Sequence, residues 1–518
     1  LSLLGLDKLQ AEGHTGIIKS GPRAGQKVKV GVLDTGIDYN HPDLKAVYKG
    51  GHDLVNNAGF DANGNVIYVD DHDPMETNYE DWVAAKANPD PVVGPPPADY
   101  KQYITSHGSH VSGTIAANTT NNNDVYSANG VAPDVDLYGY RVLGPGGRGT
   151  TDSVLNGIDQ AVKDDMDVIN LSLGATINDP LYPTSIAINN ATLAGVVCDV
   201  AAGNSGPGAA TVGSPGTSPL AITVGASTIP GVIPVMTLKN GSASYQTRLF
   251  GKTFAQADDA FKGQTYPIVD VGLGSAADYN GLDMSGKIAL VKRGGEFLQT
   301  KMANAKKAGV AGMIIWNNSA DADNQGYITS FLGVSMDNVY SVSLTQAQGQ
   351  ALSDAIYKDP KSATITFPDT LDEPIAKKGD ELANFSSTGP VKDWTIKPDV
   401  VAPGVDISST VPYDVWEPQD GVSVENRDYK YAYEIMSGTS MATPHVAGIS
   451  ALILAANPEY TPADVKSALM NTAKDINTDS KTYSVYQVGA GRVDPARAIK
   501  EDVKIQVLDK AYTVDSDS

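Results

Sequence analysis

Residues 27–36 read KVKVGVLDTG, an alternating segment that turns apolar and ends in an aspartate followed by a turn. This pattern is typical of a strand that enters a sheet covered on both faces. Similar apolar segments occur at residues 135–143, 167–173, 195–201 and 220–224. Helical patterns lie between them, such as the stripe of Val154, Ile158 and Ala161. We therefore predict a mostly parallel sheet in a three-layer α/β/α fold, with functional residues at the carboxyl ends of its strands.

The α/β pattern breaks after Ser227 and resumes near residues 384–387 and 397–403. Inside the break, the sequence indicates strands at 286–294 and 310–316 and a helix at 301–309. This stretch is predicted to be an α+β domain inserted into the main one. The predicted boundaries are 1–231 and 379–500 for the two parts of the main domain, 232–378 for the insert, and 501–518 for a tail or the start of a further domain.

Composition limits the classes of function. The net charge of −22 disfavours nucleic acid as a partner, because a phosphate backbone would be repelled. The sequence has no run of about eighteen apolar residues, so we expect no membrane span. Cys198 is the only cysteine, which excludes an intrachain disulfide. Its apolar neighbours favour a buried small hydrophobe over a reactive thiol.

Two segments, residues 50–81 and 92–103, are predicted to be surface loops. The first carries neither lysine nor arginine, and its acidic residues are Asp53, Asp61, Asp70, Asp71, Asp73, Glu76, Glu80 and Asp81. Within it, residues 61–65 (DANGN) place oxygen-bearing side chains around a glycine. A calcium-binding turn and a plain solvated turn share this pattern.

Asp34 and His107 are the first candidates for chemistry. Asp34 ends the first predicted strand, where a buried carboxylate is costly unless a donor such as a histidine N–H pairs with it. Taken alone, an aspartate at a strand end is more often a turn or cap residue. His107 opens the segment HGSHVSGT, whose small residues suit a helix packed tightly against a sheet. His110, one turn later, is expected to be a structural histidine.

Ser440 and Asn204 are the second pair of candidates. Ser440 lies in the segment GTSMATPHVAG, residues 438–448, where small residues let the chain turn into a helix and Pro444 is expected in the first turn. Free N–H groups near a helix start favour negative charge. Asn204 follows a predicted strand, and its amide can donate to an oxyanion. Taken singly, the serine is an ordinary N-cap and the asparagine an ordinary turn residue.

Together these segments resemble the subtilases, the subtilisin-like serine proteases of peptidase family S8. The order aspartate, histidine, serine is the one found in subtilisin. The motifs that carry the resemblance are residues 34–36, 107–111 and 438–442, with connecting segments at 130–133, 167–174, 203–206, 397–399 and 402–404. Residues 286–294 and 301–318 of the insert resemble a protease-associated domain.

The resemblance implies a catalytic triad of Asp34, His107 and Ser440, with Asn204 in the oxyanion hole. The implied reaction is hydrolysis of internal peptide bonds through an acyl-enzyme. The implied walls of the first specificity pocket are Ser172, Leu173, Gly174, Ala202, Gly203 and Gly213. Small residues and no acidic ones at these positions favour a large apolar substrate side chain within a broad specificity. Ser109 departs from the family, which more often has threonine there.

The resemblance implies no cofactor for catalysis and calcium as a structural ion. Asp43 matches the calcium-binding aspartate of the family, whereas residues 118–129 differ from the usual second calcium loop in length and composition. The implied partners are protein and peptide substrates, and the chain's own propeptide as folding aid and inhibitor. The implied location is extracellular, as the secreted mature form of a bacterial protein that associates with the cell wall.

Two other classes of function compete. A catalytically inactive subtilase acting as a surface binding protein is expected to have a damaged triad or oxyanion residue, and here all four residues are present. A binding module built on the insert leaves the complete triad unexplained. For the insert itself, a gate beside the substrate cleft and a passive stabilising appendage are equally favoured. In both cases its two ends must lie close together, because they leave and rejoin one connection of the sheet.

Overall fold

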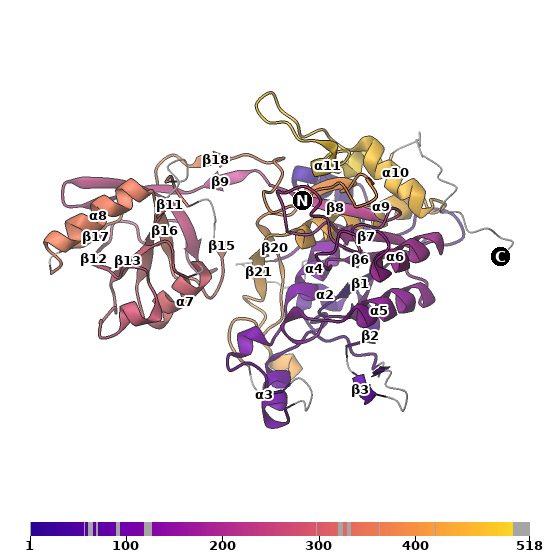
Figure 1. Cartoon of the computed structure of the whole chain (residues 1–518), viewed down its shortest axis with the longest axis horizontal. Helices are drawn as coiled ribbons and strands as arrows, with labels where there is room; N and C mark the ends of the chain where they lie inside the picture. Colours follow the sequence, from indigo (N-terminus) through magenta and orange to yellow (C-terminus); the bar gives the residue numbers. More distant parts are fainter. Residues whose placement is uncertain are drawn as a thin grey trace. The chain divides into compact units, whose positions relative to one another are not determined.

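The computed structural model describes residues 2–55, 57–60, 66–68, 71–89, 94–118, 127–296, 298–319, 325–328, 333–361, 363–419 and 421–500. The chain divides into two compact units (Figure 1). We name them the main unit, Leu1–Ile229 with Gly379–Ser518, and the insert, Pro230–Lys378. The sequence analysis placed the two junctions between residues 231 and 232 and between residues 378 and 379.

A seven-stranded sheet forms the centre of the main unit. Its order is β19-β8-β7-β6-β1-β5-β2, and every neighbouring pair is parallel. The strands are β1 Lys29–Asp34, β2 Tyr48–Asp53, β5 Asp136–Arg141, β6 Val168–Leu171, β7 Val197–Ala201, β8 Ile222–Ser227 and β19 Val400–Pro403. The predicted parallel α/β sheet is thereby confirmed.

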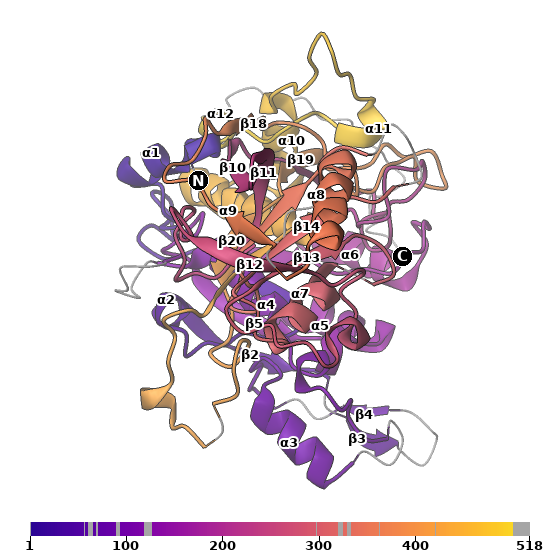
Figure 2. The same ribbon diagram turned by 90° about the vertical axis from the view of Figure 1, so that its left-hand side faces the viewer.

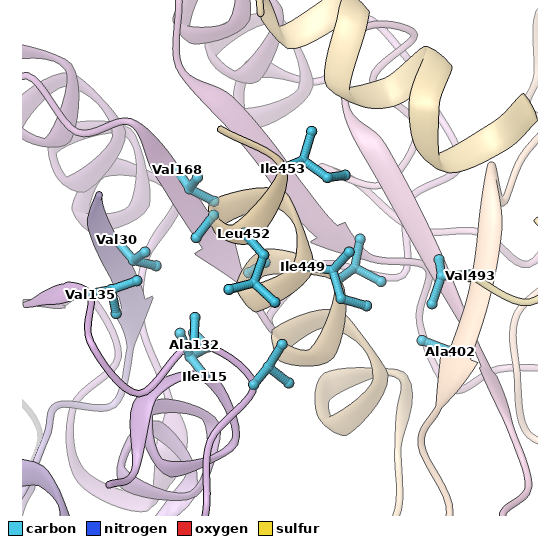
Figure 3. Packing of buried hydrophobic residues seen from close by; sticks show 14 of the residues in the cluster. Val30, Ile115, Ala132, Val135, Val168, Ala402, Ile449, Leu452, Ile453 and Val493 are labelled. Carbon is cyan, nitrogen blue, oxygen red and sulfur yellow. The ribbon is translucent and has the colours of Figure 1, made fainter. Parts of the chain in front are cut away.

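Helices cover both faces of this sheet, and successive strand residues point to opposite cores. Val168 packs in the core beneath α4 (His107–Ala116) and α9 (Thr439–Ala456), whereas Ile169 packs in the core beneath α5 (Thr151–Lys163) and α6 (Pro183–Leu193). Figure 3 shows Ile449, Leu452 and Ile453 of α9 among the strand residues of the first core. Burying each such side chain stabilises the fold by about 1.5–3 kcal/mol.

The other helices and strands of the main unit surround this core. They are α1 Leu6–Ala11, α2 Pro42–Lys45, β3 Asn57–Phe60, β4 Val66–Tyr68, α3 Tyr79–Ala87, β20 Ile407–Thr410, β21 Tyr433–Met436, α10 Pro462–Thr472, α11 Val485–Val488 and α12 Pro495–Ala498. Short 3-10 turns occur at Ser2–Leu4, Tyr100–Gln102, Pro145–Gly147 and Val424–Asn426.

Helix α9 is central to the main unit. By length and composition it is the single helix in the described ranges that could cross a membrane, but 83% of its apolar window is buried inside the unit. A buried core helix passes this test as readily as a membrane-spanning one, so α9 is weak evidence for a span. Cys198 lies on β7 in the core of α5 and α6, where burial raises the pKa of its thiol to about 12. That is the environment expected of a small hydrophobe.

The prediction that residues 50–81 form a surface loop is wrong at both ends. The segment starts inside β2, a strand of the main sheet, and it ends in α3. Gly50 and Gly51 interrupt the alternation that would have indicated a strand. The contact with β5 requires the second glycine, because a Cβ on Gly51 would lie 1.8 Å from the carbonyl oxygen of Gly139. The DANGN turn at residues 61–65 lies outside the described residues.

The insert is a small barrel with two helices. Its sheet has the order β10-β17-β12-β13-β14-β16-β11-β15, and β10 also pairs with β11, which closes the ring. The strands are β10 Val235–Asn240, β11 Ala243–Lys252, β12 Thr265–Asp270, β13 Ile288–Lys292, β14 Gly312–Trp316, β15 Gly333–Val334, β16 Ser341–Leu344 and β17 Thr364–Thr366. Helix α8 (Gln346–Lys358) packs on β12 and β14 (Figure 2), and α7 (Leu298–Lys307) packs on β14.

The two ends of the insert lie side by side, as expected for a domain spliced into one connection. Strand β9 (Gly231–Ile233) pairs antiparallel with β18 (Ile375–Lys377). The pairing continues into the main unit, where Thr228 N–H donates to the Glu381 carbonyl at 2.8 Å and Asp380 N–H donates to the Thr228 carbonyl at 3.1 Å. The insertion therefore leaves β8 and β19 paired as neighbours in the main sheet.

Asp199 is an unusual residue for the middle of this sheet. It lies fully buried on β7, where the Ser450 hydroxyl of α9 donates to its Oδ1 at 3.4 Å. Its Oδ2 has no hydrogen-bond partner among the described residues. Burial raises the pKa of this carboxyl well above its usual value. Its contribution to stability is therefore complete below about pH 4, the ordinary range of an aspartate, and is lost as the pH rises through the folded-state pKa.

We predict that Asp199→Asn stabilises the protein, and more so at pH 8 than at pH 5. The amide keeps the shape of the carboxyl without the cost of ionising it in the core, a gain of about 1–3 kcal/mol at pH 8. Thermal unfolding at both pH values measures the effect. Asp159→Asn, on the exposed face of α5, is the control and should change little. An equal shift at both pH values would show that Asp199 is not the titrating group.

Candidate active site

Three neighbouring strands bring the predicted site residues to one edge of the sheet. Asp34 is the last residue of β1, Ser172 follows β6, and Asn204 follows β7. These strands are adjacent in the order β7-β6-β1 and run parallel. Their carboxyl ends therefore meet at one edge, which is where an open α/β sheet binds its ligands.

Asp34 and His107 form a hydrogen-bonded pair. The Nδ1 of His107, the first residue of α4, lies 2.7 Å from Oδ1 of Asp34. The Thr35 N–H also donates to this oxygen, at 2.8 Å. The Asp34 side chain is fully buried, whereas the His107 side chain remains 32% exposed. A buried carboxylate thus orients an imidazole whose other nitrogen can face a substrate.

The environment of His107 favours its charged form. Burial alone would lower the pKa of the imidazole, but the charge of Asp34, its hydrogen bond and the charge of Glu76 together raise the pKa above its usual value. His110 differs, because its Nε2 lies 3.0 and 3.1 Å from the carbonyl oxygens of Ile407 and Glu434. Burial lowers the pKa of His110 to about 3. It is the neutral structural histidine that the sequence indicated.

Ser440 is the second residue of α9 and forms two reciprocal hydrogen bonds with Ser172. Its hydroxyl donates to the Ser172 carbonyl at 3.1 Å, and the Ser172 hydroxyl donates to the Ser440 carbonyl at 2.8 Å. Pro444 was expected in the first turn, but it is the sixth residue of the helix. Its missing N–H would have bound the Ser440 carbonyl, four residues back. The Ser172 hydroxyl takes that place, so the proline is tolerated.

Asn204 is held with its amide nitrogen free to donate. Its Oδ1 accepts hydrogen bonds from the Thr439 N–H at 2.9 Å and the Thr439 hydroxyl at 3.0 Å. Within the described ranges no hydrogen bond is recorded from its Nδ2. Thr439 directly precedes Ser440, so the amide lies at the start of α9. There the Met441 and Ala442 N–H groups donate to the Gly438 carbonyl, and the Ser440 N–H has no acceptor among the described residues.

A cleft of about 660 Å³ runs beside these residues. It is lined by His107 and by Ser172, Leu173 and Gly174, three of the predicted pocket walls. The other predicted walls, Ala202, Gly203 and Gly213, do not line this cleft; the Gly213 N–H donates to the Ala202 carbonyl at 3.1 Å. The sequence analysis missed further apolar lining from Leu143, Val154, Tyr182 and Pro215. The lining includes Arg148 and no carboxylate.

Other residues that the sequence analysis missed lie behind the catalytic pair. The Thr35 hydroxyl accepts from the Gly108 N–H at 2.8 Å, and Glu76 contacts Thr35 and Ser109. Thr35 directly follows Asp34 in the sequence, and this position could have identified it as a neighbour of the site. Glu76 looked like one of many acidic residues in a loop, and its burial could not be inferred from its neighbours.

Asp43, the predicted calcium ligand, has two hydrogen-bond donors in the described part of the chain. Its buried carboxylate accepts hydrogen bonds from the Tyr433 hydroxyl at 2.7 Å and the Ala128 N–H at 3.2 Å. Residues 119–126, in the second predicted calcium loop, lie outside the described residues. Within the described ranges, no three His, Cys, Asp or Glu side chains are grouped so as to hold a metal ion. Calcium also binds backbone and amide oxygens, so structural calcium, at Asp43 or elsewhere, stays a prediction.

The parallel sheet, the Asp34–His107 pair and the serine at the start of a buried helix define a protein of the subtilase class. Residues 25–491 match the Subtilase family of peptidase S8, and the chain belongs to this family.

Curated relatives agree with this assignment. The chain is 39% identical over 92% of its length to the minor extracellular protease Vpr of Bacillus subtilis. It is 33% identical over 78% of its length to a subtilisin-like protease of Arabidopsis thaliana, and 31% identical over 92% to the PII-type proteinase of Lacticaseibacillus paracasei. The matches cover 52%, 53% and 26% of those proteins, so the chain spans about half or less of each.

The hydrogen bond from Tyr433 to Asp43 gives a test of what stabilises the surroundings of Asp43. We predict that Tyr433→Phe lowers stability by about 1–3 kcal/mol, because a buried carboxylate loses a donor. The loss should be the same in chelator and in millimolar calcium, measured by thermal unfolding. Tyr357→Phe, at a tyrosine that is 71% exposed, is the matched control. A loss seen only in chelator would show that a metal ion can replace the hydroxyl, and would support Asp43 as a calcium ligand.

Proposed function

We propose that this chain is a serine endopeptidase with Asp34, His107 and Ser440 as its triad and Asn204 as an oxyanion donor. The observation that carries the proposal is the 2.7 Å contact between a fully buried carboxylate and a half-exposed imidazole, at the strand edge that also holds Ser440. An inactive relative used for binding would have no need for this charge arrangement. Membership of a protease family supports the same conclusion.

We propose one step of the reaction for each group. His107 Nδ1–H donates to Asp34, which fixes the tautomer and leaves Nε2 to accept a proton. The Ser440 hydroxyl, which now donates to Ser172, turns to His107, loses its proton and attacks the peptide carbonyl. The negative oxygen that forms accepts hydrogen bonds from the Asn204 amide and the Ser440 N–H. His107 then protonates the leaving amine, and water releases the acyl group by the reverse sequence of proton transfers.

The cleft supports a preference for apolar substrate side chains. Leu143, Val154, Leu173 and Tyr182 line it, and burying a large apolar substrate group against these apolar side chains is favourable. We propose unfolded or loosely folded proteins as substrates, with broad specificity and a large apolar residue before the cleaved bond. The first relative's name describes an extracellular protease. This name supports secretion. We further propose association with the cell wall, and a propeptide that assists folding and inhibits the mature enzyme.

Ser440→Ala provides the direct test. We predict that the variant folds, loses at least about a thousandfold in kcat and keeps only the weak catalysis of the oxyanion hole. A chromogenic peptide measures turnover, and circular dichroism shows that the fold is intact. A sulfonyl fluoride should label the wild type at Ser440 in a one-to-one ratio and leave the variant unlabelled. An unlabelled, inactive wild type would instead support the binding-protein alternative.

The raised pKa of His107 predicts the pH dependence. Only the neutral imidazole accepts the serine proton, so activity should rise with pH through the pKa of His107. Because the Asp34 pairing raises this pKa above the usual value of 6.5, the midpoint of the acid limb should lie above that value and the optimum at neutral to alkaline pH. The dependence of kcat/KM on pH measures it. An optimum in the acid range would remove His107 as the base.

A further inference from the structure

A second buried carboxylate, Glu76, lies behind the catalytic pair. Its side chain is 1% exposed and accepts hydrogen bonds from the Thr35 hydroxyl, from the Ser109 N–H at 3.0 Å and from the Ser109 hydroxyl at 2.8 Å. No lysine or arginine in the described part of the chain forms an ion pair with it. Nothing in the triad chemistry requires this residue, yet an uncompensated buried carboxylate is costly.

Glu76 also has a hydrogen bond with the Thr105 side chain. The Thr35 and Ser109 hydroxyls that contact Glu76 each accept a hydrogen bond as well. Thr35 Oγ1 accepts from the Gly108 N–H at 2.8 Å, and Ser109 Oγ accepts from the Asp38 N–H at 2.8 Å. A hydroxyl has one proton, and an ionised carboxylate can only accept. Glu76 therefore fixes the direction of both hydroxyl protons, and this leaves the lone pairs of each oxygen for the backbone amides.

These hydrogen bonds join the segments that carry Asp34 and His107. Thr35 and Asp38 belong to the loop after Asp34, and Gly108 and Ser109 follow His107 at the start of α4. The Ser106 side chain makes no capping hydrogen bond to this helix. Two N–H groups of its first turn are satisfied instead by Thr35, which accepts from Gly108, and by Glu76, which accepts from Ser109. The spacing between Asp34 and His107 thus depends on one carboxylate.

We propose that Glu76 is a positioning residue of the active site: its ionised carboxylate clamps the loop after β1 to the start of α4 and so sets the geometry of the Asp34–His107 pair. This inference rests on the proposed function. It adds a second carboxylate to the site beside Asp34, one that touches neither substrate nor reacting atoms.

The charge of Glu76 links the clamp to pH. Burial raises the pKa of this carboxyl, its hydrogen bonds with Thr35 and Ser109 oppose the rise, the Asp34 charge adds to it, and the result is about 7. The charged groups that face it are Asp34 on β1 and His107 on α4, while His110 is kept neutral by burial. A protonated Glu76 carries an O–H group that must donate a hydrogen bond. The Thr35 and Ser109 hydroxyls would then no longer both donate to Glu76 while they accept from the backbone amides. Glu76 and His107 should therefore titrate as a coupled pair in the acid limb.

The test compares Glu76→Gln with wild type, using Glu80→Gln as the matched control because Glu80 is an exposed carboxylate at the start of α3. For Glu76→Gln we expect kcat to fall about 10- to 100-fold with KM changed less than about twofold, since only the geometry of the pair is altered. The acid limb should also move to lower pH by about half a unit or more, because His107 loses a nearby negative charge. Glu80→Gln should behave as wild type.

A second measurement covers the case in which Glu76→Gln is poorly active or unstable. In a Ser440→Ala background, proton NMR of the His107 ring hydrogen bonded to Asp34 reports the imidazole titration without catalysis. Its midpoint should fall in Glu76→Gln. Ser109→Ala should move kcat and the acid limb in the same direction by a smaller amount, because one of the two hydroxyls is lost.

Three outcomes would overturn the proposal. They are an unchanged acid limb in Glu76→Gln, an unchanged His107 titration, or a loss of kcat that only matches the loss of folded protein. The last of these would leave Glu76 as a purely structural residue. Failure of the proposed function is separate, because it appears as a wild-type enzyme that a sulfonyl fluoride does not label.

Discussion

The reciprocal hydrogen bonds between Ser172 and Ser440 join the sheet to the helix that carries the serine. Helix α9 is apolar over most of its surface and buried against β6, β7 and β8, so packing alone would tolerate small slides along its axis. Pro444 removes one helical hydrogen bond, and the carbonyl left unpaired is that of Ser440. Because Ser172 supplies the missing donor, the helix has one favoured register against β6. That register places the serine at the strand edge where Asp34 lies.

Two clusters of buried charge in the main unit are compensated in different ways. Asp399 is paired with Lys397 at 2.7 Å and with Lys466 at 3.0 Å, and these cations lower the pKa of its carboxyl although burial opposes them. Asp34 and Glu76 are compensated instead by hydroxyls, backbone amides and an imidazole. Neutral donors leave the negative charge less screened than a lysine would. The site can therefore hold a proton on His107 near neutral pH, whereas the Asp399 cluster serves only to fasten strands β8 and β19.

The sequence predicted the sheet because its strands are apolar runs separated by helical patterns, and it located Asp34, His107, Ser440 and Asn204 because each lies in a short motif at a strand or helix end. It could not locate β2, since a glycine needed for close contact with β5 hides the alternation. The burial of Glu76 could not be predicted from the sequence either. Its burial depends on Thr35 and Ser109, which lie 41 and 33 residues away in the sequence and come next to it only in the folded protein. The cleft lining from Leu143, Val154 and Tyr182 also required the fold, because these residues come from separate connections. The placement of Pro444 depended on where α9 begins, which small residues leave undefined.

Three buried histidines and the partly exposed His107 show why the pKa of an imidazole moves in opposite directions in this protein. His41, His110 and His445 each place a ring nitrogen near a backbone carbonyl, and in each case burial lowers the pKa, to about 4, 3 and 4 respectively. A carbonyl dipole is too weak to offset the loss of hydration of an imidazolium. His107 loses hydration too, but its partner Asp34 carries a full charge and Glu76 adds another nearby, so its pKa moves in the opposite direction. A histidine motif alone therefore does not identify the base. The deciding feature is a buried carboxylate at hydrogen-bond distance, and the end of β1 supplies it to His107.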